Sequence, residues 1–187
     1  MSTAFATTPT SIAGVFVVKR VRRGDHRGFL ARLFSADDFA ELGWNTPIAQ
    51  INHTYTAARG AIRGMHYQYP PKAEKKLVMC VRGAVADVAV DLRDGSPTLL
   101  RHHMETLSAD NGCALLIPEG CAHGFQTLTD DAELLYLHSE FYAPAHEGGV
   151  SALDPLLSIA WPEPVGAMSD RDGKHPPLTP QYEGIRL

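Results

Sequence analysis

The sequence predicts an all-β domain built as a sandwich, a barrel or a jelly roll. Ten short apolar or alternating runs are separated by glycine, proline, asparagine and aspartate, as expected for strands joined by turns. No helical segments alternate with these runs, which argues against a parallel βαβ sheet. The chain also has 16 glycines and 13 prolines among its 187 residues, a share above average usage that indicates many turns.

Each run is expected to form one strand, because it has a strand's length and composition and ends at turn residues. In chain order, the expected strands are Val15–Lys19, Phe29–Phe34, Pro47–Thr54, Ala61–Tyr67, Leu77–Arg82, Ala84–Leu92, Leu99–Leu107, Ala114–Ile117, Gly124–Leu128 and Glu133–Glu140.

A single short helix is indicated near residues 35–43, between the second and third expected strands. Ser35 is a suitable N-cap residue, and Asp37 stands in the first turn, where the helix dipole favours negative charge. Phe39 marks an apolar side, and Gly43 follows as a stop.

The run Ala84–Leu92 alternates strictly, so its two faces differ. One face would be wholly apolar, whereas the other would carry Asp87 and Asp91. These carboxylates would then point toward whatever fills the middle of the domain.

After Tyr142 the sequence becomes rich in proline and glycine, which predicts a turn-rich C-terminal segment packed on the same domain. The length fits one domain, 1–187, and a core of this size can bury about 70% of the surface of the unfolded chain. There is no repeat of fixed period and no low-complexity segment.

Charge and apolar patterning exclude several classes of partner. Seventeen basic and 21 acidic residues give a net charge of −4, which argues against a nucleic-acid binder. No run approaches the roughly 18 apolar residues of a membrane span, and no secretory signal is recognisable. The three cysteines, Cys80, Cys113 and Cys121, form no CxxC pair, so a reduced, cytoplasmic location is expected.

Nine histidines make metal binding and acid–base chemistry the first functions to consider. His66 and His123 are the best placed, but Gln68 stands where a second histidine of a His-x-His pair would be. Two histidines without a further ligand make a poor metal site. His102 and His103 are adjacent on a strand and would point to opposite faces. We therefore do not expect a catalytic metal, and the sequence has no P-loop and no GxGxxG motif.

Several charged residues stand in apolar or glycine-rich runs. Arg27, Arg63 and Lys76 are suited to anchoring a diphosphate, although each could instead lie at a solvated strand edge. A neutral histidine that acts as a base needs an acceptor for its other nitrogen, and Asp172 is a candidate for His66. Spacing alone does not pair them.

Eight motifs that occur in order between Arg63 and Asp172 together resemble one family, and the resemblance covers about residues 12–175. They are Arg63-Gly-Met-His-Tyr-Gln, Lys76-Leu-Val-x-Cys-Val-x-Gly83, Val90-Asp-Leu-Arg-x-Gly-Ser-Pro-Thr98, Pro118-Glu-Gly-x-Ala-His-Gly-Phe125, Leu135-Tyr136, Tyr142-x-Pro-x-x-Glu147, Asp154-Pro-x-Leu-x-Ile-x-Trp-Pro162 and Ser169-Asp-Arg-Asp172. The set resembles the dTDP-4-dehydrorhamnose 3,5-epimerases and their relatives.

This resemblance implies a cupin-type jelly roll, that is, a double-stranded β-helix, which works as a homodimer without metal or cofactor. The implied substrates are nucleotide-linked 4-keto-6-deoxy sugars of the dTDP-4-dehydro-6-deoxyglucose type. The implied pathway is dTDP-rhamnose biosynthesis or the synthesis of another surface polysaccharide or glycosylated metabolite.

The resemblance also assigns roles to individual residues. His66 resembles the proton-abstracting base, Asp172 its carboxylate partner, Tyr136 the acid on the opposite face, and Lys76 the residue that steadies the enolate oxygen. His123 resembles a sugar-pocket contact and Tyr142 the aromatic that stacks on the base. Matches to nucleotide and diphosphate contacts are Arg27, Gln50, Asn52, Arg63, Glu147 and Arg171. The remaining histidines are expected to be structural or exposed: His26, His53, His102, His103, His138, His146 and His175.

The residue types suit this chemistry on physical grounds. A carbon beside a ketone becomes acidic only if the charge on the enolate oxygen is stabilised as it forms. Inversion also requires that the proton leaves one face and returns to the other, which calls for two titratable groups on opposite sides. His66 and Tyr136 are the right types, and a carboxylate partner would hold the imidazole in one tautomer.

Two departures from the family pattern fall on the nucleotide side. Arg32 stands where the family often has a glutamate, and one extra residue separates Gln50 from Arg63. The nucleotide base, the sugar and the choice between single and double epimerisation therefore stay open.

The alternative functions are a C3-only epimerase or ketoisomerase, a metal-dependent cupin enzyme, and a non-catalytic sugar- or nucleotide-binding jelly roll. The last is disfavoured because base, partner and acid are all present.

Overall fold

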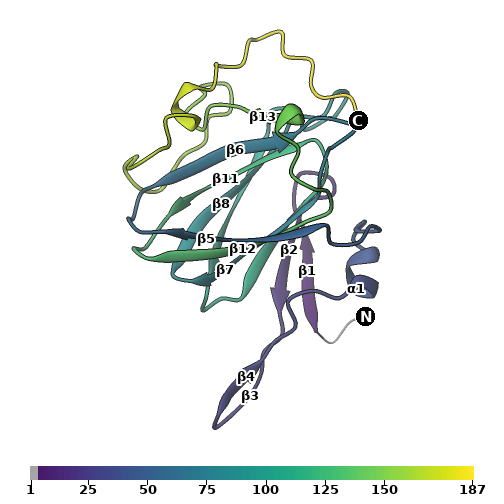
Figure 1. Ribbon diagram of the computed structural model, residues 1–187, viewed down its shortest axis with the longest axis vertical. Coiled ribbons are helices and arrows are strands. Elements are labelled where there is room, and N and C mark those ends of the chain that lie inside the picture. The colour runs from purple at the N-terminus through teal and green to yellow at the C-terminus, as the bar shows by residue number, and fades with distance from the viewer. Residues whose placement is uncertain (1–3) are drawn as a thin grey trace.

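Two antiparallel sheets packed face to face form the body of the protein in a computed structural model that describes residues 4–187 (Figure 1). The six-stranded sheet has the order β1 (Phe5–Pro9), β2 (Phe16–Arg20), β10 (Cys113–Ile117), β7 (Lys76–Arg82), β12 (Ala132–His138) and β5 (Gln50–Thr56). The five-stranded sheet has the order β13 (Glu147–Gly149), β6 (Ile62–Gln68), β11 (Cys121–Thr127), β8 (Ala84–Asp91) and β9 (His102–Ser108). The predicted jelly roll is confirmed.

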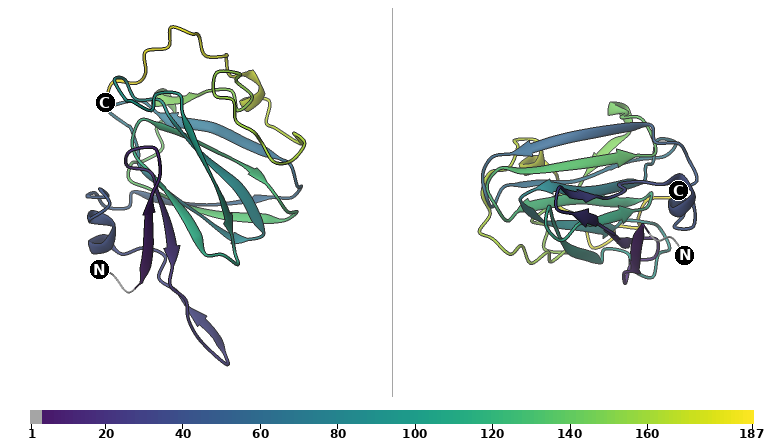
Figure 2. Two further views of the ribbon diagram at one scale, coloured as in Figure 1. Left: turned by 180° about the vertical axis from the view of Figure 1, so that it is seen from behind. Right: turned by 90° about the horizontal axis from the view of Figure 1, so that it is seen from below.

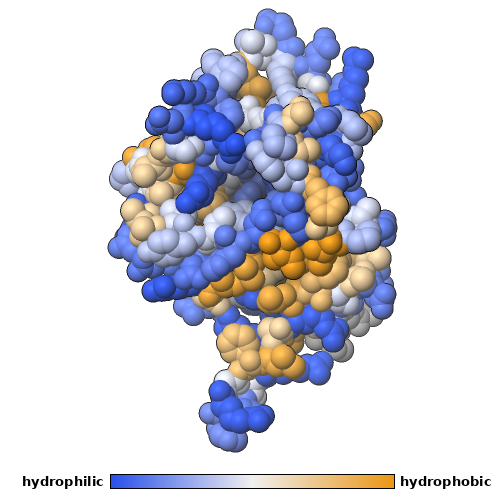
Figure 3. All heavy atoms as spheres, viewed as in Figure 1, coloured by the Kyte–Doolittle hydropathy of each residue, from blue (hydrophilic) through white to orange (hydrophobic). Residues whose placement is uncertain are grey.

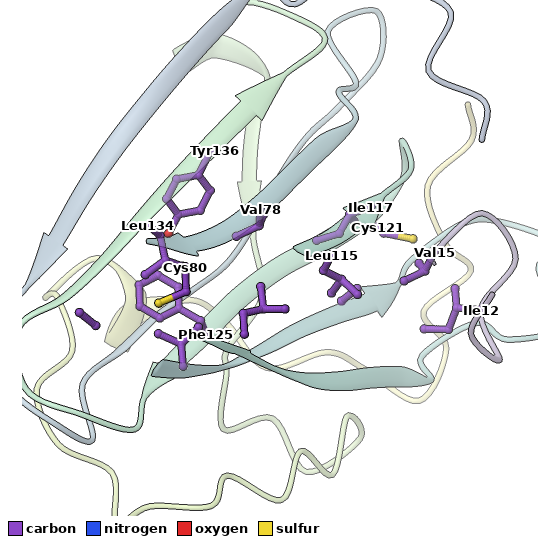
Figure 4. Packing of buried hydrophobic residues seen from close by; sticks show 14 residues of the cluster. Ile12, Val15, Val78, Cys80, Leu115, Ile117, Cys121, Phe125, Leu134 and Tyr136 are labelled. Carbon is purple, nitrogen blue, oxygen red and sulfur yellow. The ribbon is translucent and has the colours of Figure 1, made fainter. Parts of the chain in front are cut away.

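The main core lies between the two sheets. Alternate residues of the strands point inward, and Figure 4 shows Val78, Cys80, Phe125 and Leu134 converging there, with Tyr136 at one end of the same cluster. Each of these apolar side chains except Tyr136 is at most 1% exposed. Because the strands alternate, the next residue along each one reaches the opposite face of its sheet.

Strand β8 is buried on both faces, as its sequence indicates. Its inner face carries Asp87, which is fully buried, so this carboxylate does point toward the middle of the domain. Its outer face, including Val88 and Val90, packs against Leu157 and Ile185 of the C-terminal segment. Figure 2 shows this segment running over the outside of the sheets, as expected.

Asp91 was also expected to point toward the middle of the domain, but its carboxylate instead holds the loop that follows β8. It accepts hydrogen bonds from Arg93, Ser96 and Thr98 at 2.6–2.8 Å. Burial would raise the pKa of Asp91, but these donors lower it to about 2.

The helix forms where it is expected but is shorter. Helix α1 spans Ala36–Ala40 and is followed by a turn to Gly43, whose positive φ of 92° suits the glycine. Ser35 is extended but makes no side-chain capping hydrogen bond. Burial of Phe39 against Phe5 and Trp44 therefore anchors the helix in place of a cap.

The expected strand Phe29–Phe34 is wrong in extent. Only β4 (Gly28–Leu30) is a strand, and it pairs with β3 (Arg23–Asp25) in a hairpin that projects away from both sheets (Figure 1). Residues 31–34 have no neighbouring strand to pair with, and the apolar Leu30 is 75% exposed. The other expected strands are present with ends shifted by up to three residues.

The short strands β1, β3 and β13 were not expected from the sequence. The remaining elements are two 3-10 turns, η1 (Pro144–His146) and η2 (Asp172–Lys174). Among residues 4–187, no helix is long and apolar enough to cross a membrane.

Candidate active site

A cavity of about 660 Å³ opens between the two sheets, and Figure 3 shows a recess with hydrophilic surroundings on this face of the molecule. Strands of both sheets and the C-terminal segment line it. The lining residues are Asn52, Thr54, Thr56, Ala61, Ile62, Arg63, His66, Lys76, His123, Phe125, Tyr136, His138, Ala167, Met168, Ser169, Arg171 and Asp172. All four expected catalytic residues are therefore in one place.

A close approach of β6 to β11 sets the position of His66. A Cβ on Gly64 would lie 2.6 Å from the Cα of Gly124, so only glycine allows the two backbones to come this near. His66 is the register partner of His123 across these strands.

His66 is hydrogen-bonded to Asp172 over a sequence separation of 106 residues. The distance from Nε2 to the Asp172 Oδ1 is 2.8 Å, and the other carboxylate oxygen accepts the Gly64 N–H at 3.2 Å. Burial opposes ionisation of Asp172, but His66 and the Gly64 N–H lower its pKa below the ordinary value. The carboxylate therefore fixes a proton on Nε2 of the imidazole.

The environment of His66 keeps the imidazole neutral near pH 7. Burial is the largest influence and lowers its pKa, and the cations Lys76 and Arg171 lower it further, whereas Asp172 raises it in part. With Nε2 donating to Asp172, Nδ1 carries the lone pair and has no hydrogen-bond partner among residues 4–187. His66 is thus equipped to accept a proton.

Lys76 reaches the cavity from β7 of the opposite sheet. Its side chain is 8% exposed, and its Nζ lies 3.1 Å from the backbone carbonyl of His66 and 3.2 Å from Oε1 of Glu74. A buried ammonium in this position can stabilise negative charge that develops on a bound ligand.

Tyr136 enters the cavity from β12, in the sheet that faces His66. Burial is the main cause that raises the pKa of its phenol well above the ordinary value, whereas the neighbouring Thr54 hydroxyl opposes the rise. The phenol therefore stays protonated. Its ring packs edge-on against His123, 5.6 Å between centroids, and His123 is held by Asp87 at 2.8 Å.

Most of the expected substrate-binding residues lie in or beside the cavity. Asn52, Arg63, His123 and Arg171 line it. A connected group adjoins Arg171: its Nη1 lies 2.9 Å from Glu147, which accepts the Tyr142 hydroxyl at 2.9 Å, and the Tyr142 backbone N–H donates to Gln50.

Arg27 is the expected contact that the chain does not bring to its own cavity. It lies in the turn of the β3–β4 hairpin, 78% exposed and paired with Asp25 at 2.7 Å. Of the four cations named from the sequence, Arg63, Lys76 and Arg171 line the cavity of their own chain and Arg27 does not.

Three residues at the site were not predicted to belong to it: Glu74 was not named, and His138 and His175 were expected to be structural or exposed. His138 lines the cavity, and Glu74 supports it from behind at 2.8 Å. The ring of His175 lies 6.0 Å from that of His66. His138 is two residues from Tyr136 on one strand, so strand alternation predicts a shared face. His175 and Glu74 lie in loops and give no such signal.

His175 adds a possible third metal ligand beside His66 and Asp172. Its ligand atom and those of His66 and Asp172 lie within 4.8 Å of one another, the one such group among residues 4–187. However, His66 and Asp172 already share a proton, and the Arg171 guanidinium is 3.2 Å from the same imidazole nitrogen. This fixed positive charge opposes a metal cation, so the three residues fit proton transfer better.

The jelly roll brings a histidine–aspartate pair, a buried lysine and a protonated tyrosine to one cavity, and these groups suit acid–base chemistry. Comparison with known proteins identifies the family. The family model for dTDP-4-dehydrorhamnose 3,5-epimerase matches residues 9–180, and the chain belongs to this family of sugar-nucleotide epimerases.

Individual relatives agree with this assignment. The chain is 42% identical over 172 residues to a dTDP-4-dehydro-6-deoxyglucose 3-epimerase of Streptomyces bikiniensis, covering 91% of this chain and 87% of the relative. It is 42% identical over 164 residues to a dTDP-4-dehydrorhamnose 3,5-epimerase of Shigella flexneri, covering 87% and 90%. The crystal structure of a dTDP-4-dehydrorhamnose 3,5-epimerase from Bacillus anthracis with TDP and PPi bound matches with a TM-score of 0.90 at 38% identity, covering 94% of this chain and all of that one.

Proposed function

We propose that this protein inverts C3, C5 or both in a nucleotide-linked 4-keto-6-deoxy sugar of the dTDP-4-dehydro-6-deoxyglucose type, without metal or cofactor. One observation carries the proposal: His66, hydrogen-bonded to Asp172 of the C-terminal segment, and Tyr136 enter one cavity from facing sheets, with Lys76 beside them. Both carbons next to a C4 ketone have acidic hydrogens, so one set of groups serves either position.

His66 acts as the base in this proposal. Its Nδ1 takes the proton from the carbon beside the ketone, and Asp172 stabilises the imidazolium that results. Lys76 donates to the ketone oxygen as that oxygen becomes an enolate.

Tyr136 then returns a proton to the opposite face of the same carbon. Its raised pKa keeps the phenol protonated until a strong base, the enolate, is present. Inversion follows because donor and base stand on facing sheets.

The remaining residues hold the sugar and the nucleotide part of the substrate. Arg63 and Arg171 are the cations suited to the diphosphate, His123 to the sugar, and Asn52 with Gln50 to the nucleoside. Tyr142, which is 54% exposed at the mouth and hydrogen-bonded to Glu147, offers a ring on which a base can stack.

Solvent deuterium uptake tests the reaction directly. The protein is incubated in heavy water with 4-keto-6-deoxy sugars linked to different nucleotides, and uptake is located by NMR. Deuterium at C3 and C5 means double epimerisation, and at C3 alone single epimerisation. The relatives include both kinds at 42% identity, so overall identity does not choose between them.

Two controls accompany this measurement. His66→Ala is expected to exchange at least 100-fold more slowly than the wild-type protein, and an unchanged rate would refute the assignment of the base. Chelator-treated protein is expected to keep its rate. One equivalent of iron, zinc or manganese lost together with activity would instead support a metal-dependent cupin enzyme.

We also propose that the protein is a cytoplasmic homodimer. Cys80, Cys113 and Cys121 are all unpaired, as suits a reducing compartment. Figure 3 shows an apolar area below the recess that extends toward the projecting hairpin. Exposed apolar side chains include Phe29 and Leu30 of this hairpin and Ile51 of β5, and a second copy would cover them.

A further inference from the structure

A buried carboxylate behind the cavity joins two of its lining residues. Glu74 lies in the loop before β7, its side chain is 8% exposed, and it does not itself line the cavity. Its Oε1 is 3.2 Å from Nζ of Lys76 and its Oε2 is 2.8 Å from Nδ1 of His138. Each oxygen therefore holds a different cavity residue.

The register of the sheet brings these residues together. His138, the last residue of β12, pairs directly with Lys76, the first of β7. On its other side β12 pairs with β5, from which the Asn52 amide reaches Nε2 of His138 at 3.3 Å. The His138 ring is thus held at both nitrogens, and its side chain is only 10% exposed.

The charges in this group balance. Burial alone would raise the pKa of Glu74, but Lys76 and His138 together lower it below the ordinary value, so Glu74 is an anion. Glu74 accepts the Nδ1–H of His138, which leaves Nε2 as the acceptor for the Asn52 amide. One buried anion then compensates one buried cation, Lys76.

This arrangement leaves Lys76 one free donor. Of its three N–H bonds, one is directed to Glu74 and one to the His66 carbonyl. The third has no acceptor among residues 4–187, and Lys76 lines the cavity. With the other two directions fixed, the third is set by the geometry of the ammonium group.

We propose that Glu74 and His138 are positioning residues for the reaction, which together aim the free N–H of Lys76 at the ketone oxygen of the substrate. This rests on the proposed function of Lys76. Glu74 fixes the ammonium, and His138 fixes Glu74 through a tautomer that Asn52 maintains. Neither residue touches the reacting carbons.

The test compares kcat and KM for deuterium exchange in four variants. Glu74→Gln and His138→Ala are each expected to lower kcat about 10- to 100-fold, because a donor misplaced by about an ångström loses that much in rate. KM should change less than about threefold in Glu74→Gln, since Glu74 does not line the cavity. His138→Ala also releases the Asn52 amide, a proposed nucleoside contact, so this variant is judged by its kcat. His138→Asn keeps an N–H near the place of Nδ1–H and should retain more activity than His138→Ala.

The fourth variant combines Glu74→Gln with His138→Ala. Two residues that act as one unit give a double variant about as slow as the slower single variant, whereas independent effects multiply. With substrate deuterated at the reacting carbon, the isotope effect on kcat should be at least as large as in the wild type, because the proton-transfer step is the one that slows.

His53→Asn is the matched control. His53 also pairs with a glutamate, Glu133 at 3.0 Å, but it lies outside the cavity and 56% exposed. It should exchange at the wild-type rate. The inference is overturned if Glu74→Gln and His138→Ala exchange within twofold of wild type, if their effects multiply, or if they raise KM alone. If the wild-type protein itself exchanges no deuterium, the proposed function fails first.

Discussion

At the scale of single residues, the site depends on how its surroundings tune the basicity of His66. Three influences lower its pKa, namely burial, Lys76 and Arg171, and one raises it, the hydrogen-bonded Asp172. The balance favours the neutral imidazole, which is the form that a base requires. In the proposed mechanism, the same residues therefore determine both the position of the base and the pH range in which it works.

The pH dependence of kcat/KM follows from this balance. A neutral His66 is active and a protonated one is not, so the rate falls on the acidic side of its pKa. Because that pKa is lowered, the inflection is expected below the ordinary value of about 6.5. An inflection in the exchange rate at or above pH 6.5 would contradict the charge arrangement around the imidazole.

Asp172→Asn provides the comparison for this profile. Loss of the carboxylate removes the one influence that raises the pKa, so the acidic inflection should move lower still. The plateau should fall about 100-fold or more, because the amide no longer stabilises the imidazolium. His103→Asn, on β9 outside the cavity, should leave both features unchanged.

At the scale of the elements, the contact between β6 and β11 is too close to accept a side chain at Gly64. Gly64→Ala would place a methyl group 2.6 Å from the Gly124 Cα and 2.8 Å from the His123 carbonyl, at a φ of 121°. The strands would have to separate, and His66 and His123 would move with them. We expect a loss of several kcal/mol in unfolding free energy, on the order of the largest single-substitution effects, together with loss of exchange.

Gly43→Ala is the control for this substitution. Gly43 also has a positive φ, 92°, but a Cβ there meets nothing within 4 Å. The cost should be about 1 kcal/mol, the backbone term alone. Denaturant titration of both variants measures the difference, and equal losses would show that the close approach of β6 to β11 is not the cause.

Because of the loop after β8, the unfolding free energy should decrease at acidic pH. Asp91 has a folded pKa of about 2, below the roughly 3.9 of an unfolded chain, so its contribution is complete above pH 4 and is lost as the pH falls through 2. This lowering of the pKa corresponds to about 2–3 kcal/mol of unfolding free energy at neutral pH. Asp91→Asn should lower the unfolding free energy by that amount at pH 7 and by almost nothing at pH 2.

Asp94→Asn serves as the comparison. Asp94 pairs with Arg186, but both side chains are exposed, at 38% and 82%, so this ion pair contributes little. Its substitution should leave the unfolding free energy nearly unchanged at either pH. A similar loss in both variants would indicate a general charge effect and not the hydrogen bonds of the loop.

The elements differ in how far the sequence predicts them. The alternation in Ala84–Leu92 identifies β8 because every residue of this strand after Ala84 is buried on one face or the other. In Phe29–Phe34 the residue types favour a strand, but a strand also needs a partner, and no local signal shows that β4 pairs only with β3. Short strands such as β13 exist because of distant partners and have no pattern of their own.

The site shows the same division. His66, Lys76, Tyr136 and Asp172 were identified through ordered motifs, and all four line the cavity. Glu74 was missed because its role arises from the pairing of β7 with β12. This pairing brings Glu74 to His138, which is 64 positions away in the sequence. Contacts of this kind depend on register, which the sequence does not state.

At the scale of the whole molecule, the position of Arg27 bears on assembly. The family resemblance makes it a nucleotide contact, yet it lies in a projecting hairpin outside the cavity of its own chain. Both statements hold together if the hairpin of one subunit reaches the cavity of the other in the proposed homodimer. Light scattering should then give twice the 20.4 kDa mass of the chain.

Mixed dimers test this arrangement. Arg27→Ala and His66→Ala are each expected to be nearly inactive alone. Random exchange of equal amounts of the two variants makes about half of the dimers mixed. In each mixed dimer, one of the two cavities has an intact His66 served by an intact Arg27. About a quarter of the wild-type activity should therefore return. No recovery in a mixture that light scattering shows to be dimeric would mean that each hairpin serves its own chain.

The location of Asp172 in the C-terminal segment has a practical consequence. The base stands on a strand of the sheet, whereas its partner arrives on a segment that is held by its packing against the outside of that sheet. Release of this segment would leave the strands in place but separate the two groups. Catalysis by the proposed pair would then cease before the circular dichroism of the sheets changes, so a loss of activity would report the release of the last quarter of the chain.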